Sequence, residues 1–254
     1  MSGAHTHALY HHGDSPVHRL PAHVKIVAAF ALVFAVVATP REAMWVFALE
    51  AALLVGLAAV AGLRPGFVAS RLLIEVPFVL VALLLPFFGS GERVDVLGVS
   101  LSVEGLWSMW NILAKATLGL MTSIVLAGTT EMTDILRGFD SLRVPRILTA
   151  IMGFMLRYFD VVVGELRRMR VAMSSRGYRP RWFGQLGPYA RSVGVLFLRS
   201  YERGERVYLA MVSRGFTGVM PAASRDHAPV GTWAVALTPA LVAWVAVTAA
   251  WLAR

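Results

Sequence analysis

A short phrase that could hold a partner protein is written twice in this sequence. Residues 172–178 read Ala-Met-Ser-Ser-Arg-Gly-Tyr and residues 210–216 read Ala-Met-Val-Ser-Arg-Gly-Phe, so five of seven positions are identical and the last pair exchanges one aromatic for another. The guanidinium groups of Arg176 and Arg214 can each donate several hydrogen bonds to carbonyl or carboxylate oxygens. The repetition predicts two similar sockets on the partners of this chain.

Each copy lies where a long helix is expected to end. Arginine is favoured in a last turn by the negative end of the helix dipole, and glycine is a common stop. Taken singly, Ser175-Arg176-Gly177 and Ser213-Arg214-Gly215 would therefore be ordinary helix ends. The matching Ala-Met before both copies and the aromatic residue after them favour a shared binding role.

Two charged residues fall inside apolar stretches. Glu50 and Lys115 lie within predicted membrane spans, where a charge is costly and often functional. They lie about six and nine residues from the predicted external ends of their spans, so at ~1.5 Å rise per residue their depths are similar. We predict that they form an intramembrane ion pair. A proton relay is the alternative, but no further acidic residues line up with them.

Histidines gather near the N-terminus, at His5, His7, His11, His12, His18 and His23. Histidine is the commonest metal ligand, so weak metal binding is one interpretation. A defined site needs ligands held together by a fold, and residues 1–22 lack an apolar framework. We therefore expect a mobile polar tail with no fixed metal site. Cysteine is absent, which excludes disulfides and thiol chemistry.

The composition is that of a membrane protein. Hydrophobic residues make up 57% of the chain and charged residues 15%, where soluble domains average about 25% charged. A bilayer-spanning helix needs ~20 mostly apolar residues. The stretches that meet or approach this length lie at about 23–39, 44–62, 72–88, 106–128 and 230–252.

The basic residues orient these spans. Residues 131–227 contain 16 arginines against eight acids, and further cations lie before the first span and between the second and third. Cytoplasmic segments carry the excess of Lys and Arg, so the N-terminus is predicted to be cytoplasmic and the C-terminus external. Nucleic-acid binding would also suit a basic segment, but no aromatic-and-basic binding motif accompanies the charge.

Periodic apolar residues predict helices in the basic region. One helix is expected to begin at Pro145 and end at Gly177, a second to run from Pro188 to Gly215, and a short amphipathic piece to cover 131–139. Residues 89–105 carry glycines and alternating valines, which is typical of a small hairpin.

The sequence thus predicts an all-α polytopic membrane protein with about five transmembrane helices and a cytoplasmic pair of long amphipathic helices. Its predicted parts are a mobile cytoplasmic tail at 1–22, a four-span bundle at 23–128, a cytoplasmic region at 129–229 and a last span at 230–254.

These residues resemble the transmembrane T component of energy-coupling factor transporters, a branch of the ABC transporters. That family carries two Ala-Arg-Gly signatures, each ending a long cytoplasmic coupling helix, and serine replaces alanine in both triplets here. The resemblance extends over nearly the whole chain from about residue 15. Further similar phrases are Thr129-Thr130, Ile135-Leu136, Gly138-Phe139, Val144-Pro145 and Tyr201-Glu202-Arg203-Gly204-Glu205-Arg206, and His18-Arg19-Leu20-Pro21 is similar to the cobalt-type members.

The resemblance implies a non-catalytic scaffold in a prokaryotic plasma membrane. Its coupling helices would grip two cytoplasmic ABC ATPases, with a signature arginine in a groove of each. Its spans would hold a separate substrate-binding membrane subunit, and possibly a further small one. ATP would be bound by the partner ATPases, because this chain has no Gly-rich run followed by Lys-Ser or Lys-Thr. The implied substrate is cobalt, with nickel or a vitamin as alternatives.

The residues argue against two other classes of membrane protein. An intramembrane hydrolase would need a nucleophile and base, or paired aspartates, within the spans. No histidine or aspartate lies deep in any predicted span. A stand-alone ion-coupled carrier often repeats broken spans around a midplane site, whereas the repeat in this chain is in the polar region.

Overall fold

The computed structural model describes residues 10, 13–89, 92–96, 99–178, 182, 185, 187–218 and 228–253. These residues fall into two compact units. The first, here called the bundle unit, comprises the described residues of Leu9–Gly138 and Asp226–Arg254. The second, the helix-pair unit, comprises those of Phe139–Arg225.

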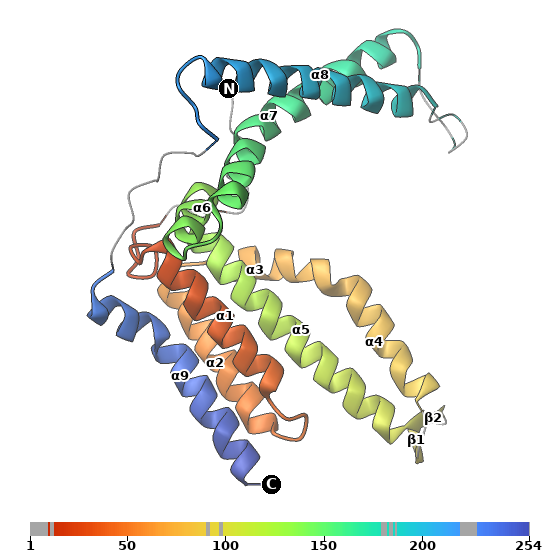
Figure 1. Ribbon diagram of the computed structural model, residues 1–254. Helices are drawn as coiled ribbons and strands as arrows, with labels where there is room; N and C mark the ends of the chain where they lie inside the picture. The colour runs from red at the N-terminus through yellow and green to blue at the C-terminus, as the bar shows by residue number, and fades with distance from the viewer. Residues whose placement is uncertain are drawn as a thin grey trace. The chain divides into compact units, whose positions relative to one another are not determined.

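The bundle unit contains all five stretches that were predicted to span the membrane, and each is helical (Figure 1). Its helices are α1 (Ala22–Ala38), α2 (Met44–Val60), α3 (Pro65–Leu72), the 3-10 turn η1 (Leu73–Glu75), α4 (Val76–Phe88), α5 (Val103–Thr129) and α9 (Val230–Leu252). Both α1 and α2 pack against α5 and α9, so these four helices form a ring, and α4 packs on the outer side of α5.

The third predicted span, at about 72–88, consists of more than one helical segment. It begins earlier, at Pro65, and η1 interrupts it between α3 and α4. Pro77 lies in the first turn of α4, where its missing N–H leaves no hydrogen bond unmade. The prediction of 72–88 was therefore too short by one helix. Hydropathy alone did not find α3, because its eight residues include two polar side chains, Ser70 and Arg71.

The predicted hairpin is confirmed between α4 and α5. Strand β1 (Arg93–Val96) pairs antiparallel with β2 (Val99–Ser102), with Arg93 opposite Ser102. Ser102 then becomes the N-cap of α5, because its Oγ accepts a 3.2 Å hydrogen bond from the Gly105 N–H.

Among the residues that the structure describes, length and composition mark four helices as able to cross a bilayer: Pro65–Phe88, Val103–Thr129, Arg146–Ser175 and Val230–Leu252. Three of these belong to the predicted spans. Helices α1 and α2 are shorter, at 17 residues, which is about 25 Å at ~1.5 Å per residue and near the lower limit for a span. The fourth, Arg146–Ser175, was predicted to be cytoplasmic, and it carries Arg157 and Asp160 within its apolar part.

The helix-pair unit holds α7 (Arg146–Ser175) and α8 (Gly187–Val212). Helix α6 (Met132–Ser141) precedes them along the chain, and its residues up to Gly138 belong to the bundle unit. Pro145 is the N-cap of α7, as its fixed backbone angle favours. The predicted bounds of all three helices are confirmed to within two residues, apart from the last turn of α8, which is described below. Helices α7 and α8 run antiparallel, because Met173 contacts Ser192 at one end and Glu165 contacts Arg199 farther along.

Candidate functional site: two matched helix ends

The first repeated phrase folds into a glycine-terminated helix end. Helix α7 ends at Ser175, and Gly177 takes the left-handed backbone conformation with φ of +78°. The Tyr178 N–H donates back to the Met173 carbonyl (3.1 Å) and the Gly177 N–H to the Ser174 carbonyl (3.0 Å). This pair of bonds is the Schellman motif, which satisfies carbonyls that the helix would otherwise leave open.

The second phrase repeats the same geometry at the end of α8. Gly215 has φ of +84°. The Phe216 N–H donates to the Met211 carbonyl (3.0 Å), and the Gly215 N–H donates to the Val212 carbonyl (2.9 Å). The predicted glycine stops are therefore confirmed at both helices, and both arginines occupy the residue just before the glycine.

This motif explains why the match extends beyond the Ser-Arg-Gly triplet to the methionine and the aromatic residue. A Schellman end is often accompanied by an apolar contact between the residue that donates the outer bond and the residue that accepts it. Those positions are Met173 with Tyr178 and Met211 with Phe216, and all four side chains are half-buried. The helix-end motif thus accounts for the matching methionine and aromatic residue. It does not require an arginine side chain at the position before the glycine.

The arginines point away from the chain's own contacts. Arg176 and Arg214 are exposed, as are Ser175 and Ser213 beside them. Within the described part of the chain, neither guanidinium forms an ion pair or a hydrogen bond. Each arginine therefore lies at a glycine-terminated helix end, and its guanidinium donors are not used by the described residues.

A nearby ion pair shows the contrast. Glu165 on α7 is almost fully buried and accepts hydrogen bonds from Arg199 Nη1 at Oε1 and from Arg203 Nη2 at Oε2 (3.2 Å). These two arginines fasten α8 to α7. The sequence does not indicate this brace, because Glu165 is more than thirty positions from both arginines and no local pattern links them.

Glu50 and Lys115 were predicted to pair, and the structure gives each a different partner. Glu50 is fully buried in the bundle and its Oε1 accepts a hydrogen bond from Thr39 Oγ1 (3.0 Å). Lys115 Nζ donates to the Val37 carbonyl (2.8 Å). No salt bridge joins the two charges within the described residues, so electrostatic coupling between them stays a prediction.

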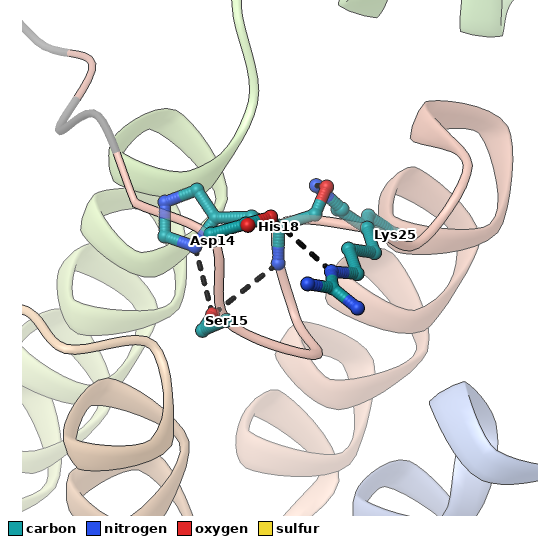
Figure 2. A network of polar contacts seen from close by, with 5 residues as sticks. Asp14, Ser15, His18 and Lys25 are labelled. Carbon is teal, nitrogen blue, oxygen red and sulfur yellow. Dashed lines mark hydrogen bonds and ion pairs between the residues drawn. The ribbon is translucent and has the colours of Figure 1, made fainter.

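Part of the predicted N-terminal tail is folded. Residues 13–20 form a turn in which Ser15 Oγ lies 2.8 Å from His18 Nδ1 (Figure 2). Tyr10 packs edge-on against the His18 ring. The predicted tail boundary at residue 22 is therefore too late. Val17 packs against the apolar core of the bundle, and Pro16 and Leu20 line a cavity together with bundle residues, so this segment has an apolar framework that composition did not reveal.

The histidines do not gather in the described residues. His18 lies in the turn and His23 packs beside Trp233 on α9. No group of three or more potential metal ligands is found among the residues that the structure describes. His5, His7, His11 and His12 lie outside those residues.

Comparison with known proteins assigns the class of this helix arrangement. The family model of CbiQ, described as cobalt transport protein, matches residues 13–225. The chain belongs to the CbiQ family. The match begins at the N-terminal turn and extends beyond the second helix end, so it includes both arginine-bearing ends and all the bundle helices except α9.

Individual relatives of this CbiQ family chain also carry transport names. It is 24% identical over 238 residues to a protein of Methanocorpusculum labreanum named as a fused cobalt transport protein, CbiMQ, covering 90% of this chain and 40% of that one. It is 31% identical over 141 residues to the nickel permease LarQ of Lactiplantibacillus plantarum, covering 50% and 48%. The chain thus matches half or less of the length of these relatives. Together with the apolar helices, the family makes this chain a multi-pass membrane component of a transporter.

Proposed function

We propose that this chain is the transmembrane coupling subunit of an energy-coupling factor importer that takes up cobalt. Its α7 and α8 would lie on the cytoplasmic side and bind two ABC ATPases. Its bundle would hold a separate substrate-binding membrane subunit. ATP-driven movement of the ATPases would reach that subunit through this chain, which has no reaction of its own.

The observation that carries the proposal is the pair of matched helix ends. A single exposed arginine at a helix end is common, because the helix dipole favours it there. Two ends with the same hydrogen bonds, the same left-handed glycine and an exposed arginine in the same position suit two copies of one partner. Paired ATPase subunits present two copies of one groove.

The charges of α7 and α8 support a place outside the bilayer. Glu165, Arg199 and Arg203 form a braced ion cluster, and α7 also carries Arg167, Arg168 and Arg170. Hydrogen bonds from Arg199, and next from Arg203, hold the pKa of Glu165 below its usual range, so the brace is ionised at neutral pH. A charged cluster of this size is costly in hydrocarbon.

Exposed apolar side chains support the proposed partners. In the helix-pair unit, Met155, Phe197 and Tyr201 are each about two-thirds exposed. A polar-flanked apolar surface of this kind is typical of a protein interface. In the bundle unit, α4 exposes Phe78 and Phe88, a surface suited to lipid or to another membrane subunit.

The test is co-purification followed by metal uptake. We expect the chain, extracted in mild detergent with its native neighbours, to retain an ATPase pair and one or more small membrane proteins. Proteoliposomes of that complex should take up cobalt in an ATP-dependent manner, measured by elemental analysis with nickel in a parallel assay. Uptake of nickel alone would favour the named relative's substrate, and uptake by the purified single chain would support a stand-alone carrier.

A further inference from the structure

Lys25 is a buried cation that the proposed function does not use. It lies in the first turn of α1 with only 7% of its surface exposed. Positive charge near a membrane span is expected to face the cytoplasm and its lipid headgroups. Lys25 instead points into the bundle, beside the N-terminal turn that carries Asp14, Ser15 and His18 (Figure 2).

All three hydrogen-bond donors of Lys25 have partners. Nζ donates to the Thr129 carbonyl at 2.8 Å, to Thr130 Oγ1 at 3.2 Å and to the His18 carbonyl at 3.1 Å. No carboxylate of the described residues forms a salt bridge with it. Burying an ammonium group among neutral partners lowers the stability of the fold, so other interactions have to offset that cost.

The partners of Lys25 mark the point where α5 ends. Thr129 is the last residue of α5, and Thr130 turns the chain into an extended conformation with φ of −138°. The last carbonyls of a helix lack partners within the helix and form its negative end. The lysine supplies both a donor and a positive charge there, which stabilises the α5 end at this residue.

Helix α6, which follows the same turn, is also in contact with α1. A Cβ placed on Gly138 of α6 would lie 2.8 Å from Ile26 Cδ1 and 3.0 Å from the His23 backbone nitrogen. Helix α6 therefore lies directly on the first turn of α1, and only a glycine fits. The first turn of α1 thus contacts α5 through Lys25 and α6 through the Gly138 position.

We infer that Lys25 is a positioning residue that clamps the α5–α6 turn and so couples the helix-pair region to the bundle. This inference rests on the proposed function. The chain enters α7 from the bundle through this turn and α6, and it returns from α8 to α9 by a second connection. On the entering connection, a turn held firmly by α1 would transmit ATPase movement to the spans, whereas a turn free to bend would absorb it.

The experiment separates coupling from assembly. Lys25→Met keeps the length of the side chain and removes its donors, while Arg19→Met removes one exposed positive charge from the same segment as a control. Each variant is assembled with the ATPases and the substrate-binding subunit in proteoliposomes. The readouts are ATPase retained per chain and cobalt taken up per ATP hydrolysed.

We expect Lys25→Met to retain the ATPases and to lower uptake per ATP by roughly fivefold or more, the factor that ~1 kcal/mol of lost clamp stability corresponds to. Arg19→Met should match the wild type, and Lys25→Arg, which keeps donors, should recover part of the loss. A loss of assembled complex with an unchanged ratio in what remains would overturn the inference, because a purely structural lysine would behave in that way.

A second variant keeps the test decisive if Lys25→Met does not assemble. Gly138→Ala should also lower uptake per ATP, since its methyl group displaces α6 from α1 without touching Lys25. Gly153→Ala on α7 is the control, because a Cβ there has nothing within 4 Å. Equal cobalt uptake per ATP for Gly138→Ala, Gly153→Ala and the wild type would overturn the inference that this turn is clamped. Failure of the wild-type chain to retain any ATPase would overturn the proposed function instead.

Discussion

Charge reversal at the two helix ends tests the proposed coupling site most directly. Arg176→Glu and Arg214→Glu replace exposed side chains that have no ion pair or hydrogen bond within the described chain, so the fold should lose only the ~0.3–1 kcal/mol by which a helix C-terminus disfavours a negative charge. The hydrogen bonds of each helix end come from the backbone of the neighbouring glycine and aromatic residue and stay in place. An effect larger than this should therefore come from partner binding.

The expected magnitude follows from the donors that are removed. A hydrogen bond that involves a charged group contributes about 1.5–3 kcal/mol. Loss of one such contact at one arginine should weaken ATPase capture by about 10- to 150-fold, because 1.4 kcal/mol corresponds to a factor of ten. The two ends are separate, so their effects should approach additivity in free energy, and the double variant should capture almost no ATPase.

The assay is pull-down of the ATPases by the detergent-solubilised chain across a concentration series, together with ATP turnover. Arg170→Glu is the matched control, since Arg170 is exposed on the same helix six positions before Arg176. This control makes the same charge change on α7, but away from the end of the helix. Normal capture by the double variant, or an equal loss in the Arg170→Glu control, would refute the assignment of these arginines.

Three further predictions concern the fold. Gly177→Ala should shift the α7 end and weaken ATPase capture, because a left-handed conformation costs a non-glycine residue about 1–2 kcal/mol; an unchanged crosslinking pattern at this end would contradict it. Gly105→Ala should lower the melting temperature by an amount equivalent to about 1–3 kcal/mol, because its Cβ would lie 2.6 Å from the Leu85 carbonyl oxygen. Gly119→Ala is the control and should leave the melting temperature unchanged, because a Cβ there has nothing within 4 Å. Glu50→Gln and Lys115→Met test the predicted coupling of these two charges: the double variant should lose less stability in thermal unfolding than the sum of the two single variants. Losses that add within about 0.5 kcal/mol would show that each charge depends only on its own hydrogen-bond partner.

Features decided by neighbouring residues could be predicted from the sequence. The apolar stretches are helical, the glycines at 177 and 215 end α7 and α8, and the valine alternation forms a hairpin. Each depends on side-chain periodicity or backbone freedom within a few positions, which the order of residues states directly. The family could be inferred for the same reason, because its signature is a local phrase.

Contacts between distant residues were decided only by the tertiary structure. Lys25 donates a hydrogen bond to the carbonyl of Thr129, which follows it by 104 positions, and no pattern near Lys25 in the sequence indicates that contact. Glu50 and Lys115 match in depth, but depth along two helices does not say which way each side chain points, and packing turned Glu50 toward Thr39. Helix rotation is set by how the apolar surfaces of all the neighbours fit together, so no local pattern in this sequence could specify those partners.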